Sequence, residues 1–96
     1  MTVKTEIVEA HVVVSGRVQG VAFRAYTVDA AVRANVCGWV RNLPHQQVES
    51  VLQGERDDVE KVVAFMRIGP PAAQVIDAVI SWRTPVEYFH GFEIRH

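Results

Sequence analysis

Strand-like and helix-like stretches follow one another along this chain in an order that few folds accommodate. Residues 7–15 are apolar and β-branched, which predicts a strand that is covered on at least one face. Residues 36–42 and 47–53 predict two more strands, and the short segment between them predicts an antiparallel hairpin. Before the hairpin, one face of a predicted helix carries Phe23, Thr27, Ala30, Ala31 and Ala34. This helix is expected to end near Asn35, a residue type that tolerates the left-handed conformation.

A second helix and two more strands complete the pattern. Asp57, with Glu60 three residues later, resembles a capping box and predicts the helix start. Apolar residues continue at helical spacing in Val59, Val62, Val63 and Met66. Gly69-Pro70-Pro71 ends the helix, residues 74–83 predict a fourth strand, and residues 92–95 predict a short last one.

The order is therefore strand, helix, strand, strand, helix, strand, with a short extra strand at the end. This order predicts an α+β protein of the ferredoxin-like α/β-sandwich class (βαββαβ), in which two helices pack on one face of a mixed, mainly antiparallel sheet. The 96 residues are expected to form a single domain, residues 1–96.

A glycine-punctuated stretch, Ser15 to Arg24, joins the first predicted strand to the first helix. Such a loop can point successive backbone N–H groups, together with the positive end of the helix dipole, into one concavity. The stretch contains Arg17 and Arg24, but no residue that would serve as a general acid or base. It is therefore expected to hold an anion.

Composition excludes several other classes of protein. The net charge of −1 gives no overall basic field for nucleic acid, and no segment has the ~20 apolar residues of a membrane span. The four histidines and the single cysteine, Cys37, lack the spacing of a zinc site, so no metal or other cofactor is expected. One cysteine and an N-terminus unlike a signal peptide predict a cytoplasmic protein.

Two stretches resemble the signatures of the acylphosphatase family. The first is Gly16-Arg17-Val18-Gln19-Gly20-Val21-Ala22-Phe23-Arg24. The second is Gly38-Trp39-Val40-Arg41-Asn42, followed at the family's spacing by Val48 and Gly54. Gly69-Pro70-Pro71 and the closing Phe92-Glu93-Ile94-Arg95-His96 resemble the family as well, so the resemblance covers nearly the whole chain.

The resemblance implies a metal-independent hydrolase that cleaves the carboxyl-phosphate anhydride of small acyl phosphates to carboxylate and inorganic phosphate. It implies that Arg24 binds the phosphoryl oxygens and that Asn42 positions the attacking water. A phosphate cradle is implied for Arg17, Val18, Gln19, Gly20, Val21 and Ala22, although Arg17 is equally well explained as a solvated loop residue. Inorganic phosphate or sulfate should compete with substrate, and the protein is expected to be a monomer that binds neither nucleic acid nor membrane.

The predicted hairpin tip departs from the family's pattern. The family usually has glycine where this chain has Gln46, and often has an acidic residue at the position of His45. Neither residue is a type that favours a turn with positive φ, so the tip is expected to be strained if it adopts one.

Two other functions remain open at this level. The first is a ferredoxin-like binding module for RNA or a small regulatory ligand. An RNA-binding sheet needs aromatic residues on adjacent strands, whereas the third predicted strand offers Val48, Ser50 and Leu52. The second is an accessory domain that binds phosphate or carbamoyl phosphate without turnover.

Overall fold

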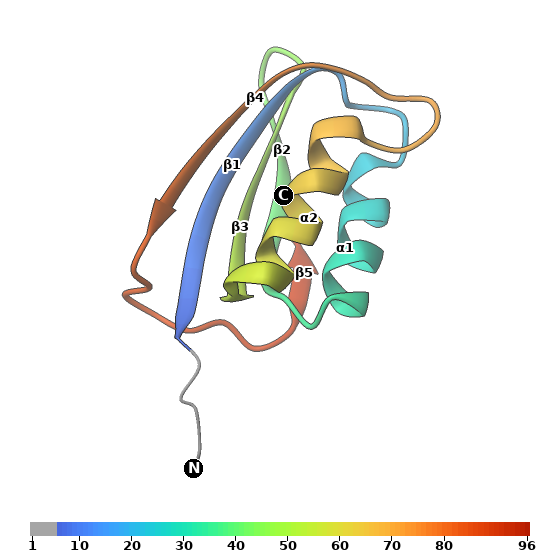
Figure 1. Cartoon of the computed structure of the whole chain (residues 1–96). Helices are drawn as coiled ribbons and strands as arrows, with labels where there is room; N and C mark the ends of the chain where they lie inside the picture. Colours follow the sequence, from blue (N-terminus) through green and yellow to red (C-terminus); the bar gives the residue numbers. More distant parts are fainter. Residues whose placement is uncertain (1–5) are drawn as a thin grey trace.

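The computed structural model describes residues 6–96 as a five-stranded sheet with two helices on one face (Figure 1). The elements in chain order are β1 (Ile7–Arg17), α1 (Phe23–Arg33), β2 (Cys37–Leu43), β3 (Gln47–Glu55), α2 (Arg56–Ile68), β4 (Gln74–Arg83) and β5 (Phe92–Ile94). The strand order is β4-β1-β3-β2-β5, and every neighbouring pair is antiparallel except β2 and β5. The predicted ferredoxin-like fold is confirmed.

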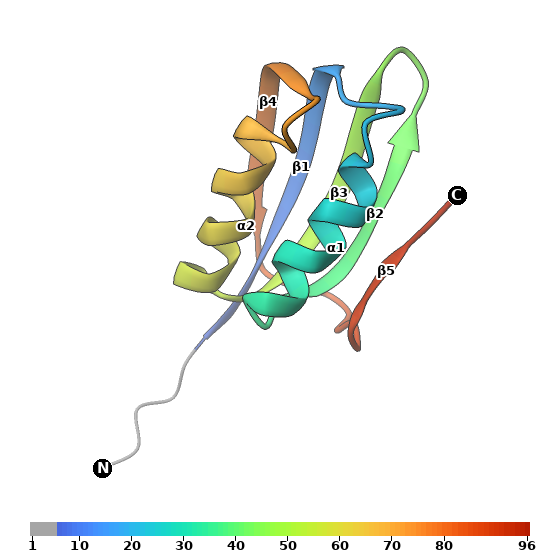
Figure 2. The ribbon, with the colours of Figure 1, turned by 90° about the vertical axis from the view of Figure 1, so that its right-hand side faces the viewer.

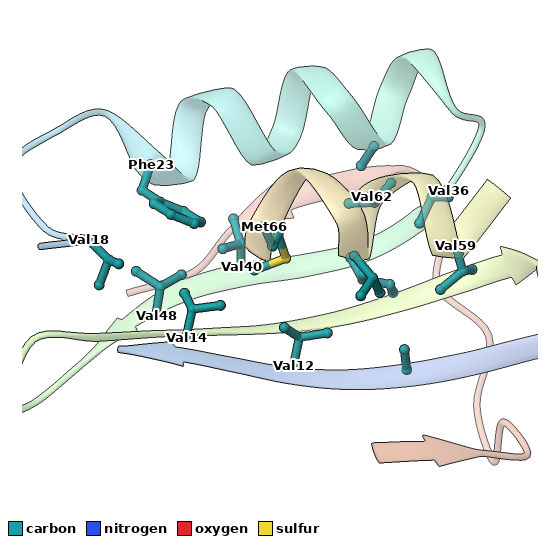
Figure 3. Close-up of a cluster of buried hydrophobic side chains, with 14 residues drawn as sticks. Val12, Val14, Val18, Phe23, Val36, Val40, Val48, Val59, Val62 and Met66 are labelled. Carbon is teal, nitrogen blue, oxygen red and sulfur yellow. The ribbon is translucent and has the colours of Figure 1, made fainter. Parts of the chain in front are cut away.

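The core lies between the helices and the covered face of the sheet. Alternate residues of β1, namely Ala10, Val12 and Val14, face the helices and are almost fully buried, as the period of two along a strand requires. Figure 3 shows Val12 and Val14 beneath Phe23 of α1 and Met66 of α2. Val18 and Phe23, on either side of the β1–α1 loop, are only 1% and 2% exposed. They anchor both ends of the loop in the core, and between them Gly20 and Ala22 are exposed.

β1 runs two residues further than its apolar pattern indicates and carries a bulge between Ser15 and Gly16. Gly16 has φ +125°, and a Cβ there would lie 2.3 Å from the carbonyl oxygen of Gln74. Only glycine therefore lets β4 approach β1 at this point, where the chain turns from the sheet into the loop.

The helix ends follow the predicted signals at two of the three positions for which the sequence offered one. Asn35 has φ 59° just after α1, and Gly69 caps α2, as expected. The capping box is wrong: α2 begins at Arg56, and its N-cap residue Glu55 makes no side-chain hydrogen bond to the helix. Because β3 continues through Glu55, Asp57 already lies in the first turn, where its charge favours the positive end of the helix dipole. Glu60 pairs with Arg56 instead.

Neither helix of residues 6–96 is long and apolar enough to cross a membrane.

Candidate anion site at the start of α1

The β1–α1 loop lies at the same end of the molecule as the turn between β2 and β3 (Figure 2). A cavity of about 190 Å³ opens there between the loop, the first turn of α1, β2 and β5. It is lined by Val18, Gln19, Gly20, Ala22, Phe23, Arg24, Ala25, Asn42 and Ile94. The fold thus brings together the two predicted catalytic residues, Arg24 and Asn42, which stand 18 positions apart in the sequence.

Successive backbone N–H groups of the loop and the first helical turn have no acceptor within the described chain. Val18 N–H bonds to the Gly16 carbonyl oxygen at 3.0 Å, and Tyr26 N–H makes the first helical bond, to Ala22, at 3.1 Å. No hydrogen bond of residues 6–96 uses the N–H groups of residues 19–25. Gly20 and Ala22 both have positive φ, and backbone turns of this kind make concave N–H sites for anions. The amide of Val18, by contrast, is already used.

Arg24 adds a positive charge beside these N–H groups. It is the second residue of α1, it is half-buried, and it lines the cavity. None of the ion pairs found among residues 6–96 includes Arg24. A cation at a helix N-terminus opposes the helix dipole. The charge of Arg24 and the positive end of the α1 dipole therefore both favour an anion in the cavity.

Asn42 supplies an acceptor on the β2 side of the cavity. It pairs with Val48 in the β2–β3 ladder, near the end of the strand. Its Oδ1 is buried and has no hydrogen-bond partner. A buried acceptor without a partner costs about 1–3 kcal/mol, so this oxygen is suited to a group that enters the cavity with a proton to donate.

Arg41, next to Asn42, points away from the cavity. Its Nε donates to Glu49 Oε1 at 2.7 Å, on the sheet face opposite the helices, and His11 donates to the other oxygen of Glu49 at 2.6 Å. Burial raises the pKa of Glu49, but the hydrogen bonds and charges of His11 and Arg41 outweigh it and lower that pKa overall. The positive charge of Arg41 is thus paired with Glu49 on the sheet face opposite the helices and does not contribute to the cavity.

Two residues of the predicted cradle do not line the cavity. Arg17 ends β1 and is exposed, and Val21 packs against the core cluster. Sequence reasoning did not identify Ile94 as a residue of the cavity wall. Ile94 lies there because β5 pairs parallel with β2, which places Ile94 opposite Val40. No spacing signal links residue 94 to this loop, so only the sheet order reveals it.

The cavity wall offers no carboxylate, imidazole or thiolate side chain, the usual ligands of metal ions in proteins. Within residues 6–96, no group of three or more His, Cys, Asp or Glu residues is close enough to hold a metal ion.

The tip of the β2–β3 hairpin is strained in the way its residue types suggest. His45 and Gln46 have φ values of 64° and 56°. The carbonyl oxygen of Gln46 accepts the Gly16 N–H at 3.2 Å, so the tip is also tied to the start of the loop.

Gln46→Gly should therefore stabilise the fold by about 1 kcal/mol, because the relief of left-handed strain exceeds the added entropy of the unfolded chain. The urea midpoint measures the change. Gln74→Gly is the matched control: Gln74 is exposed at the start of β4 and is not among the positive-φ residues, so this variant should be less stable. A midpoint for Gln46→Gly at or below that of the parent protein would contradict the strain.

Comparisons with known proteins find relatives along nearly the whole chain. The family model described as Acylphosphatase matches residues 10–94. An acylphosphatase from Nostoc sp. is 48% identical over 94 residues, which cover 98% of this chain and 92% of the relative. The crystal structure of acylphosphatase from Bacillus subtilis matches with a TM-score of 0.89 and 29% identity, over 93% of this chain and 99% of the other. An acylphosphatase structure from Coxiella burnetii matches with a TM-score of 0.85 and 36% identity, over 98% and 100%.

Proposed function

The chain belongs to the acylphosphatase family, and we propose that it hydrolyses small acyl phosphates to a carboxylate and inorganic phosphate at the cavity beside α1. One observation carries this proposal: a single cavity is lined by loop residues whose backbone N–H groups have no acceptor among residues 6–96, by Arg24, and by Asn42, whose buried Oδ1 has no partner among the same residues. The first two suit a phosphoryl dianion. The third suits a nucleophile that approaches it.

The phosphoryl group lies in the loop concavity and accepts hydrogen bonds from the backbone N–H groups of residues 19–22. Val21 contributes its N–H group alone, because its side chain packs against the core. Arg24 contacts two of its oxygens, because a guanidinium presents a planar fork of donors and stays charged. The first turn of α1 directs its positive end at the same group. Arg17 stands outside this set, since it is exposed at the end of β1.

Asn42 holds the attacking water. Its Oδ1 accepts a hydrogen bond from the water and so turns an oxygen lone pair of the water toward phosphorus, while both protons stay with the water. Positioning and charge stabilisation carry most of the catalysis in phosphoryl transfer, where the enzyme does little covalent chemistry. A carboxylate is a good leaving group, so no general acid is required. The cavity wall provides none.

No metal takes part in the proposed reaction, because the positive charge comes from Arg24 and from backbone dipoles. The acyl group leaves the phosphoryl group on the side away from the water. Apolar side chains in the cavity wall, those of Ala25 and Ile94, are available to contact it.

Turnover of benzoyl phosphate, followed by the loss of its ultraviolet absorbance, tests this function directly. We expect hydrolysis that continues unchanged in EDTA, because the cavity wall holds no metal-ligand set. An accessory phosphate-binding domain or an RNA-binding module would bind without turnover. Activity lost in EDTA and restored by Mg²⁺ would contradict the metal-free mechanism but not the reaction.

Inorganic phosphate and sulfate should inhibit competitively, since the cradle recognises the anion and not the acyl group. The measurement is KM and kcat for benzoyl phosphate at several phosphate concentrations. KM should rise while kcat stays constant. Non-competitive inhibition, or none at millimolar phosphate, would remove the loop from the binding site.

A further inference from the structure

The phosphate cradle and Asn42 belong to different elements, so something must fix one relative to the other. We infer that the side-chain amide of Gln19 does this and is a positioning residue for the attacking water. This inference rests on the function proposed above. It assigns the Gln19 side chain a role separate from that of its backbone N–H group.

Both hydrogens of the Gln19 amide are used to hold the hairpin. Nε2 donates to the carbonyl oxygen of Leu43 at 2.6 Å and to that of Gln47 at 3.0 Å. Leu43 and Gln47 face each other in the last register pair of β2 and β3 before the tip. Leu43 directly follows Asn42, so these two hydrogen bonds, called here the Gln19 bridge, hold the strand end that carries the water-binding side chain.

The Gln19 bridge is the only hydrogen-bonded link between residues 18–22 and the hairpin in the described part of the chain. The other hydrogen bonds of these loop residues are local: Val18 bonds to Gly16, and Ala22 accepts from Tyr26. The contacts nearer the tip, from Gly16 to Gln46 and from Gln47 to Ser15, belong to the end of β1. Without the bridge, no hydrogen bond among residues 6–96 would join residues 18–22 directly to the hairpin that carries Asn42.

An amide is the side chain that this position requires. A neutral NH₂ group supplies two donors to two carbonyl oxygens, whereas a carboxylate would be repelled by both. A lysine could donate to the same carbonyl oxygens, but its positive charge would also attract the phosphoryl group and so draw it away from Arg24. In-line attack tolerates little misplacement, and a shift of about 1 Å can cost about 100-fold in rate. The bridge therefore acts on kcat more than on the affinity for phosphate.

Gln19→Met tests the bridge, because methionine keeps the length and the backbone N–H group but has no donor. We expect kcat for benzoyl phosphate to fall about 10- to 100-fold. The phosphate Ki should stay near that of the parent protein. Gln19→Asn, which keeps the amide but is too short to reach both strands, should show the same pattern if the methionine variant folds poorly. Gln74→Met, at an exposed glutamine with no side-chain hydrogen bond among residues 6–96, is the matched control and should be unchanged.

A double-mutant cycle with Asn42→Ala separates positioning from general stability. If Gln19 acts through Asn42, Gln19→Met should cost almost nothing further in the Asn42→Ala background, since residues that act as a unit are not additive. Losses that multiply, an unchanged kcat, or a phosphate Ki that rises as much as kcat falls would overturn the inference. Full turnover by Asn42→Ala alone would instead refute the proposed water site, and the bridge with it.

Discussion

Replacing Arg24 with alanine should remove phosphate binding and turnover together. The phosphoryl group is anionic in the ground state and in the transition state, so one guanidinium stabilises both. We expect kcat/KM to fall by at least about 10³, the lower end of what an arginine contributes to phosphoryl transfer. The phosphate Ki should rise about 10- to 100-fold, as expected for the loss of charged hydrogen bonds worth about 1.5–3 kcal/mol.

Arg24→Lys should recover little of this loss, because a lysine is a point charge and cannot match the planar fork. Stability should not fall with activity. Arg24 forms no ion pair within residues 6–96, and its charge opposes the dipole of α1. Arg33→Ala is a suitable control, since Arg33 is an exposed arginine in the last turn of the same helix. Phosphate inhibition retained in Arg24→Ala would exclude Arg24 from the binding site.

Asn42→Ala should lower kcat by about 10²–10³, the cost of losing one positioned polar group in an active site. Its phosphate Ki should remain close to that of the parent protein, because the side chain holds the water and not the phosphoryl group. The two variants therefore differ in Ki even where both lose turnover. Equal weakening of phosphate binding in both would mean that the roles assigned to them are wrong.

The same variant makes a second prediction about stability. Because Oδ1 of Asn42 is buried without a partner, its removal should leave the urea midpoint unchanged or raise it. A variant that loses turnover while keeping or gaining stability identifies a group retained for activity. A large drop in the midpoint would indicate that Asn42 is needed for the fold.

Most of the fold could be predicted from the sequence, because most elements have a local apolar pattern or a glycine, proline or asparagine that marks where they end. β4 matches its predicted bounds, and Asn35 and Gly69 mark helix ends through their own backbone preferences. The capping box failed for a non-local reason. The pairing of β3 with β1 extends through Glu55, so the strand, and not the Asp57–Glu60 pair, decides where α2 begins.

The candidate site could be predicted only in part. Motif resemblance pointed to Arg24 and Asn42, and the cavity contains both. It could not reveal that Ile94 joins them, because that depends on the parallel pairing of β2 and β5. Nor could it show that the Gln19 side chain reaches the hairpin, since that contact spans 24 positions to Leu43 and has no periodic signal.

A binding surface made of main-chain N–H groups has an evolutionary consequence. Every residue except proline carries the same N–H group, so side chains at residues 20–22 can change without changing the anion that is recognised, provided that the backbone keeps its turns and Gln19 keeps its bridge to the hairpin. Ala22 illustrates this, because it holds a left-handed conformation without being glycine. The substitutions tolerated at these positions are therefore those that fit the backbone conformation of the loop, and they say little about a change of substrate.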